Sequence, residues 1–328
     1  MNTNNRNLMT YRKKGYCWRF REKMENNPSY ECSIGGVKVR TEHVMYHLIL
    51  KIAKQDERVL AVYMNGSRVN DNIPADIFQD FDIVFVVKET DSFINDKKWI
   101  VNFGDILYMQ YPDESPYYPS DKENFYGWLI QFTDGNRIDL HVETEKHALE
   151  HIGDDKLYKV LLDKNEAFSD IHKSTDIDYW VKKPTEDQFL CTCNEFWWCL
   201  NNVAKGLWRE EIPYVQDMVN FHVRKQLEKI LSWKIGLLTE FSVSIGKSGK
   251  YMKNWLDIKE WEVYLSTYFT GEVSEAWGAV MRMCDLFEVN AIYVSEKLGF
   301  HYNKLEGKNA MEFLVHVRLL PKDAKEVC

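Results

Sequence analysis

The first half of the chain carries the residue pattern of a β-sheet. Short runs of Val, Ile, Leu and aromatic residues are separated by loops rich in Asp, Pro and Asn, of which residues 111–121 are an example. Short apolar runs between such loops are typical of buried or half-buried strands. The pattern predicts one helix and four strands, with the helix at about 40–55 and the strands at about 59–64, 81–87, 127–133 and 137–143.

Beyond about residue 180, this pattern gives way to long stretches with a helical spacing of apolar residues. Thr185, with Asp187 and Gln188 just after it, is a typical helix start. The spacing predicts helices near 186–208, 211–240, 258–269, 272–298 and 308–319. We therefore predict an α+β fold, in which a sheet domain at 39–180 precedes an α-helical bundle domain at 181–328 and residues 1–38 form an extension.

The turn Gly66-Ser67-Arg68 follows the first predicted strand. Glycine lets the backbone approach a phosphate closely, serine offers a hydroxyl and an amide, and arginine can bind two phosphate oxygens at once. A Gly-Ser pair after a strand is also common in ordinary turns. The turn by itself does not decide between these two interpretations.

Two carboxylates, Asp80 and Asp82, stand at the start of the next predicted strand. Side chains two residues apart on a strand point to the same face, so these two should lie side by side. Neighbouring carboxylates repel each other unless a cation lies between them, and Mg²⁺ is commonly held by one or two carboxylates together with substrate phosphates. The alternative is a solvated Asp-x-Asp at the end of a loop.

A third carboxylate, Asp139, lies in the segment 137–142, where polar and apolar residues alternate strictly. The alternation places Asp139 on the polar face of its strand. If this strand lies beside the strand of Asp82, Asp139 could complete a second metal site or take the proton of an attacking hydroxyl. The other interpretation is an edge strand with one solvated face. Together, the turn and the three carboxylates favour nucleotidyl transfer.

These residues resemble the polymerase-beta-like nucleotidyltransferase superfamily, whose pattern is Gly-Ser, then Asp-x-Asp, then an aspartate in a downstream strand. Longer strings are similar to the aminoglycoside 6-adenylyltransferases, which modify streptomycin. The resemblance runs from about Val39 to about residue 300, and Phe81 stands where that family commonly has tyrosine. The strings that carry it are 57–64, 66–70, 72–74, 78–83, 176–179, 193–197 and 205–207.

The resemblance implies a mixed-sheet nucleotidyltransferase domain with Mg²⁺ as cofactor and ATP as co-substrate. It implies transfer of AMP to a hydroxyl of a cationic aminoglycoside, with the 6-position of streptomycin as acceptor and antibiotic resistance as the result. In related enzymes a lysine of the helical domain is expected to meet the triphosphate, which implies this role for Lys205. The expected catalytic and metal-binding residues are Asp80, Asp82 and Asp139, and the expected nucleotide-binding residues are Gly66, Ser67, Arg68 and Lys205.

The predicted helix 186–208 offers residues for the second substrate. Glu195 precedes three aromatic residues and could pair with a cationic group while a ring such as that of Trp198 stacks on it. The alternative is a surface carboxylate beside core tryptophans. Helix cations are ordinarily solvated, but four more are candidates for phosphate binding: Arg209, His222, Lys225 and Lys234.

Composition narrows the classes of function. Hydrophobic residues at 45% and aromatic residues at 14% exclude general disorder, and seven cysteines without a C-x-x-C pair predict reduced packing residues. Residues 39–328 hold 34 basic and 47 acidic residues, a balance of −13. An acidic body suits a small cationic substrate and disfavours nucleic acid.

We expect a cytoplasmic protein that does not contact a membrane, because no apolar run approaches the ~18 residues of a membrane helix and the N-terminus does not resemble a secretion signal. We also expect no contact with nucleic acid, and a monomer rather than an oligomer. Two enzyme alternatives remain, namely a nucleotidyltransferase for a different small-molecule antibiotic or for nucleic acid. A non-catalytic protein of the same fold would normally lack the full set of carboxylates.

Residues 1–38 differ from the rest in charge, with eight basic and three acidic residues, and lack a sustained hydrophobic period. The string from Val39 to Glu42 resembles the Met-Arg-Ser-Glu start of relatives, which predicts translation from a GTG codon at Val39. The preceding segment would then be disordered or absent in the cell. The alternative is a genuine N-terminal arm that docks through Tyr16, Trp18 and Phe20.

Overall fold

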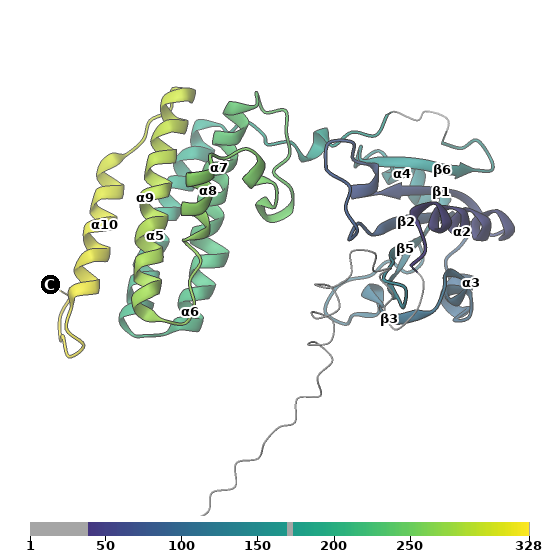
Figure 1. Cartoon of the computed structure of the whole chain (residues 1–328), viewed down its shortest axis with the longest axis horizontal. Coiled ribbons are helices and arrows are strands. Elements are labelled where there is room, and N and C mark those ends of the chain that lie inside the picture. The colour runs from purple at the N-terminus through teal and green to yellow at the C-terminus, as the bar shows by residue number, and fades with distance from the viewer. Residues whose placement is uncertain (1–38, 169–172, 328) are drawn as a thin grey trace, which may run out of the picture. The chain divides into compact units, whose positions relative to one another are not determined.

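The computed structural model describes residues 39–168 and 173–327. The chain divides into two compact units, the first ending at Ser174 and the second starting at Thr175 (Figure 1). The sequence places this boundary slightly later, between residues 180 and 181. The predicted extension, residues 1–38, lies outside the described part of the chain, so the predicted translation start at Val39 stays a prediction.

A six-stranded mixed sheet organises the first unit, and its strand order is β3-β4-β5-β2-β1-β6. Strands β2 and β5 are parallel neighbours, and the other pairs are antiparallel. The strands are β1 (Val59–Asn65), β2 (Phe81–Val87), β3 (Ile106–Gln110), β4 (Phe125–Phe132), β5 (Arg137–Thr144) and β6 (Tyr158–Asp163). The predicted α+β class is confirmed. Among the strands, the apolar pattern misses the two edge strands, β3 and β6, because an edge strand needs no continuous apolar run. It also misses two short helices, Asp91–Asn95 and Glu145–His151.

Both faces of the sheet are covered by helices. The larger core lies between one face and α2 (Glu42–Gln55), α3 (Asp91–Asn95) and the 3-10 helix η3 (Trp99–Phe103). The smaller core on the other face includes α4 (Glu145–His151). Alternation along β2 sends Phe81, Ile83 and Phe85 to the larger core. Asp82, between them, therefore faces the side of the smaller core.

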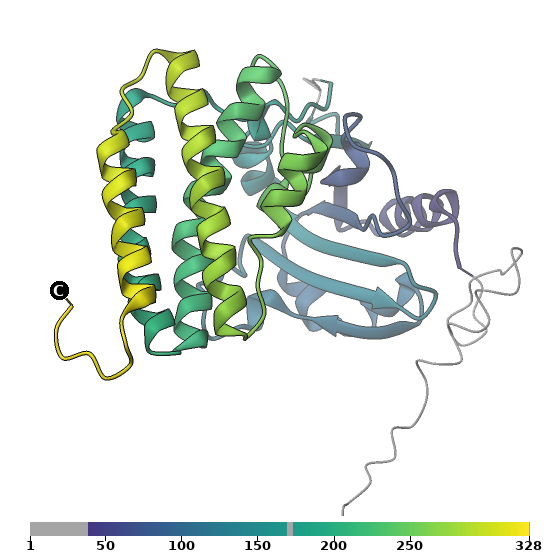
Figure 2. The same ribbon diagram turned by 60° about the vertical axis from the view of Figure 1, so that its left-hand side comes forward.

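The second unit is helical, and its long helices lie side by side (Figure 2). Helix α5 packs against α7 and α10, and α7 packs against α9. Thr185 caps α5 as predicted, since its side chain accepts a hydrogen bond from the Gln188 amide. The helices are α5 (Glu186–Trp208), α6 (Ile212–Asp217), α7 (Arg224–Leu238), α8 (Ile258–Leu265), α9 (Val273–Leu298) and α10 (Lys304–Leu319).

The predicted continuous helix at 211–240 is wrong in one respect. A π-helical turn, Met218–Val223, separates α6 from α7. A π-turn accommodates one extra residue in a single turn, and the buried residues Val215, Val219 and Val223 continue through it at a spacing of four, so the sequence pattern shows no break. No helix in the described ranges is both long and apolar enough to cross a membrane. Three of the cysteines described are buried, namely Cys193, Cys199 and Cys284.

The contact between Arg40 and Asp134 joins the first described residues to the β4–β5 turn. Arg40 Nε donates to Asp134 Oδ2 at 2.6 Å, and Asn136 Nδ2 donates to the same oxygen at 2.9 Å. Burial by itself would raise the pKa of Asp134, but these hydrogen bonds outweigh it and lower the pKa from 3.8 to about 2.

We expect Asp134→Asn to lower the free energy of unfolding by about 2 kcal/mol at neutral pH, because it removes charged hydrogen bonds in a buried place. The folded-state pKa lies below the unfolded value, so this contribution is present above about pH 4 and is lost as the pH falls towards about 2. Melting temperatures of both proteins across this range should converge in acid. The exposed Asp71→Asn serves as control. A difference in melting temperature between the parent and Asp134→Asn that does not change with pH would contradict the stabilising role of the Asp134 carboxylate.

Candidate active site

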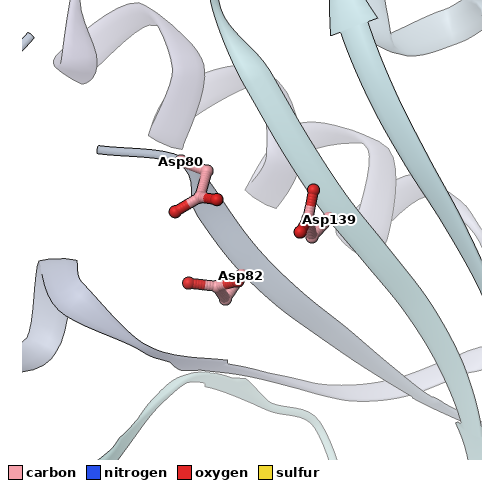
Figure 3. A group of neighbouring side chains, drawn as sticks. All are labelled: Asp80, Asp82 and Asp139. Atoms are coloured by element: carbon pink, nitrogen blue, oxygen red, sulfur yellow. The ribbon is translucent and has the colours of Figure 1, made fainter. Parts of the chain in front are cut away.

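Three carboxylates gather on the sheet face opposite the larger core. The parallel pairing of β2 with β5 sets Asp82 directly opposite Asp139, and Asp80 precedes β2 (Figure 3). One oxygen from each carboxylate lies within 4.8 Å of the others. Within residues 39–168 and 173–327, no other group of three or more His, Cys, Asp or Glu side chains has such spacing. The structure thus brings together all three acidic residues predicted from the sequence.

The electrostatics of this group favour a bound cation. The pKa of Asp82 is raised to about 7, first by burial and then by the like charges of Asp80 and Asp139, while Arg137 and Arg68 act in the opposite direction. Such a carboxylate resists ionisation because burial and the nearby carboxylates both disfavour its charged form. Oxygen ligands of this number and spacing fit a hard divalent cation such as Mg²⁺.

Arg137, for which the sequence pattern predicted no role, belongs to the same group. Its Nε and Nη2 atoms donate to the two oxygens of Asp139, each at 2.7 Å, and its Nε lies 3.7 Å from Asp80 Oδ2. The alternation along β5 that selects Asp139 also selects Arg137, two residues earlier on the same face. This two-point contact fixes the orientation of the Asp139 carboxylate.

The turn at Gly66 lies directly against the carboxylates. Gly66 has a φ of +76°, and a Cβ atom at this position would lie 1.9 Å from Asp82 Oδ2. Only glycine can therefore occupy the position without displacing the carboxylate. Ser67 follows as the first residue of the 3-10 helix η2 (Ser67–Val69). The turn and the carboxylates predicted from separate stretches of sequence thus form one group.

The structure places Arg68 differently from the sequence expectation of a phosphate ligand. Its Nε and Nη2 atoms donate to the carbonyl oxygens of Asp80 and Gln79, at 2.9 and 2.6 Å. Its guanidinium carbon lies 3.8 Å from the centre of the Phe81 ring, and Nη1 lies 3.1 Å from a Glu42 oxygen. With so many contacts, the guanidinium fixes the segment that leads into β2 and hence the position of Asp80.

The predicted ligands on α5 lie in the helical unit and line three different cavities. Glu195 lines a cavity of about 690 Å³, Trp198 one of about 290 Å³ and Lys205 one of about 360 Å³. Glu195 and Trp198 therefore do not face one common space, in contrast to the sequence expectation. Phe196 and Trp197 are buried in the helical core, which leaves neither ring to stack on a group held by Glu195.

The four further helix cations differ in their surroundings, and one of them, His222, is exposed. Lys225 pairs with Glu228 at 2.8 Å and Lys234 pairs with Glu260 at 2.7 Å, so both charges are already balanced. Arg209 lines the same cavity as Lys205. Two of the cations predicted to bind phosphate, Lys205 and Arg209, therefore share a cavity.

The comparisons with known proteins agree with this geometry. The model of the streptomycin adenylyltransferase family matches residues 39–317. A protein from Campylobacter jejuni described as aminoglycoside 6-adenylyltransferase is 39% identical over 264 residues, which are 80% of this chain and 91% of the relative. A protein of the same description from Bacillus subtilis is 37% identical over 80% of this chain and 93% of the relative.

A third relative of that description, from Staphylococcus aureus, is 33% identical over 84% of this chain and 98% of its own length. A solved structure titled aminoglycoside 6-adenyltransferase from Bacillus subtilis aligns at 32% identity with 86% of this chain and 100% of that chain, with a TM-score of 0.43. From the extent of the family match and the identity to these relatives, the chain belongs to the streptomycin adenylyltransferase family and is a nucleotidyltransferase enzyme.

Proposed function

We propose that the protein transfers AMP from ATP to a hydroxyl of an aminoglycoside, with the 6-position of streptomycin as acceptor, and thereby confers antibiotic resistance. The observation that supports this most directly is the group of Asp80, Asp82 and Asp139 against the Gly66 turn, in a chain of this family. The acceptor class and the 6-position are those in the description of the relatives, aminoglycoside 6-adenylyltransferase. A cytoplasmic location and a monomeric state remain predictions.

Asp80 and Asp82, with Asp139, are the residues that would hold Mg²⁺. When bound, the ion would neutralise the triphosphate charge that develops as pyrophosphate leaves. The raised pKa of Asp82 is consistent with a site that is completed by positive charge. The turn at Gly66 and Ser67 brings its backbone close to the carboxylate oxygens of this site. We propose that the phosphate groups of ATP lie against this turn. Arg68 acts by fixing Asp80, and Lys205 stays a proposed triphosphate ligand.

Asp139 is the residue we propose to activate the acceptor hydroxyl, either by taking its proton or as a metal ligand. Its two-point contact with Arg137 keeps the carboxylate oriented, as a positioned base requires. We expect Asp139→Asn to lower kcat by about 10²- to 10⁴-fold, the usual contribution of a general base, while KM for ATP stays near that of the parent. A steep rise in the ATP KM with a normal kcat would assign Asp139 to nucleotide binding instead.

Glu195 is the proposed contact for a cationic group of the acceptor. It is half-buried and lines the largest of the three cavities, whose lining also includes Asp187 of the same helix. We expect Glu195→Gln to raise KM for the aminoglycoside about tenfold, equivalent to ~1.4 kcal/mol, with a smaller effect on ATP. The exposed Glu296→Gln carries the same charge change as a control. Equal effects of Glu195→Gln on both substrates would leave Glu195 as a surface carboxylate.

The deciding experiment incubates the full chain with ATP, Mg²⁺ and a panel of aminoglycosides, followed by mass analysis of the products. A product heavier by one AMP, formed with streptomycin and lost when Mg²⁺ is removed, is the expected result. Transfer to another aminoglycoside of the panel would replace streptomycin as the proposed acceptor but would support AMP transfer as the reaction. Transfer to RNA in a parallel arm would favour the nucleic-acid alternative, which the net charge of residues 39–328 disfavours.

A further inference from the structure

Two histidines of α4, His147 and His151, lie about one helical turn apart. Side chains with i,i+4 spacing are neighbours on a helix, and the centroids of these two rings are 4.4 Å apart, with their planes tilted by 42°. His147 is partly exposed and His151 is exposed, so an ion from solution can reach the pair. Two histidines at this spacing are a known way for a helix to hold a metal ion.

A carboxylate holds each ring through its Nδ1 atom. His147 Nδ1 donates to Glu143 Oε1, and the other oxygen of Glu143 accepts from the Tyr63 hydroxyl. His151 Nδ1 donates to Asp154 Oδ2 at 3.0 Å. A neutral imidazole with its proton on Nδ1 carries its lone pair on Nε2, which is then the metal-binding atom. Histidine ligands of metal sites generally have such a carboxylate partner, because it fixes the tautomer and the orientation of the ring.

The positions of the two carboxylates turn the Nε2 edges towards each other. Glu143 belongs to β5 and precedes His147 by four residues, whereas Asp154 follows His151 by three. The two Nδ1 atoms are therefore drawn towards opposite ends of α4. Because Nε2 lies across the imidazole from Nδ1, the edges that carry Nε2 are directed at the space between the rings. One ion with bonds of about 2.0–2.1 Å to each nitrogen can bridge rings at this separation.

The charge and the ligand type select the kind of ion. Asp154, Glu150 and Glu143 all act on the His151 ring, and all three are acidic. Their negative charge attracts a divalent cation. Imidazole nitrogen suits Zn²⁺, Ni²⁺ and Cu²⁺, whereas Mg²⁺ prefers oxygen ligands such as the three carboxylates of the candidate active site. The two groups therefore have different ion preferences.

Helix α2 offers a comparison, because His43 and His47 have the same spacing. Both are exposed, and in residues 39–168 and 173–327 no side-chain hydrogen bond, ion pair or ring contact involves either of them. An ion that binds such a pair has to order both rings, and this ordering weakens binding. The rings on α4 are already ordered by their carboxylate partners. The same spacing thus gives a preorganised pair on α4 and an unordered pair on α2.

We propose that His147 and His151 form a metal site that binds one Zn²⁺ through their Nε2 atoms, with Glu143 and Asp154 as positioning residues. Zn²⁺ usually takes four ligands, and no third His, Cys, Asp or Glu completes the group within the described ranges, so water fills the other positions. The site is separate from the transfer reaction. Binding requires neither ATP nor an acceptor.

The test is a calorimetric titration of the full chain, without an added histidine tag, with Zn²⁺ in millimolar Mg²⁺. His147→Gln and His151→Gln should each weaken binding at least about tenfold. Asp154→Asn should weaken it about tenfold, because loss of a partner of a metal-binding histidine costs about 10- to 100-fold in affinity. His43→Gln and His47→Gln are the matched controls and should bind as the parent does. Zn²⁺ bound elsewhere is common to all of these proteins and cancels in the comparison.

A spectroscopic readout identifies the ligand atoms. In the chain labelled with ¹⁵N at histidine, Zn²⁺ should shift the Nε2 resonances of His147 and His151 while their Nδ1 atoms stay protonated. Equal affinity of the parent and both α4 variants, ligation through one ring only, or an equal loss for His43→Gln would overturn the proposal. Should a histidine variant fail to fold, the exposed Asp154→Asn and the spectrum of the unmodified chain still decide.

The outcomes are also independent of the proposed function. Zn²⁺ binding by the two histidines without AMP transfer to any aminoglycoside would leave this site standing and remove the proposed reaction. AMP transfer with no difference in Zn²⁺ affinity between the parent and the α4 variants would do the reverse.

Discussion

Asparagine at position 82 is expected to lower kcat/KM by about 10³-fold or more, equivalent to at least ~4 kcal/mol of transition-state stabilisation. The reason is geometric, since Asp82 lies between Asp139 on the neighbouring strand and the Gly66 turn, within 4.8 Å of the other two carboxylates. An amide keeps the shape of the side chain but removes the charge that would bind a divalent cation. Steady-state kinetics with ATP, Mg²⁺ and streptomycin measure the loss.

A readout apart from catalysis tests the cation site itself. Millimolar Mg²⁺ should raise the melting temperature of the parent protein but not that of Asp82→Asn, because a ligand that binds the folded state stabilises it. Without Mg²⁺ the variant should melt no lower than the parent, since the substitution removes one of three mutually repelling carboxylates. Asp71→Asn is the control. Turnover within about tenfold of the parent would contradict the assignment.

Alanine at position 66 is expected to reduce activity by about 10²-fold or more, because displacements near 1 Å at a reacting centre have effects of this size. The added Cβ would lie 1.9 Å from Asp82 Oδ2, and the φ of +76° is unfavourable for any residue with a side chain. The carboxylate or the turn must therefore move. The rate of AMP transfer and the Mg²⁺-dependent melting shift should both decline.

Gly153→Ala provides the matched control for this substitution. A Cβ atom at Gly153 meets nothing within 4 Å, so activity and melting temperature should stay near those of the parent. Since Gly66 and Gly153 both belong to the first unit, the comparison separates the clash from the general effect of a glycine replacement. A fully active Gly66→Ala protein would show that the turn does not constrain Asp82.

The interior of the sheet was predictable from sequence, and its edges were not. β1, β2 and β5 are apolar runs or strict alternations, patterns that arise because each strand is buried on at least one face. β3 has mostly exposed side chains, with Tyr108 67% exposed, so its sequence carries little of this signal. The π-helical turn before α7 escaped prediction for a related reason, since it changes the backbone and not the order of apolar residues.

Within the site, alternation along the strands identified Asp80, Asp82 and Asp139, and glycine at position 66 marked the turn. The role of Arg68 could not be predicted, because its partners are carbonyl oxygens near β2, which every residue type possesses. Arg137 is different, since it stands in the alternation beside Asp139. The contact of Arg137 with the Asp139 carboxylate could have been predicted from this alternation, whereas its distance from Asp80 could not.

The sequence alone determined which residues share a face, because local periodicity fixes the direction of each side chain within a strand or helix. It therefore determined the α+β class and the acidic residues of the site. Only the tertiary structure decided that β5 pairs in parallel with β2 in the register that sets Asp82 against Asp139. It likewise decided that Glu195 and Trp198 line separate cavities. The physical reason is that strand register and helix packing depend on contacts between distant segments, which local periodicity does not encode.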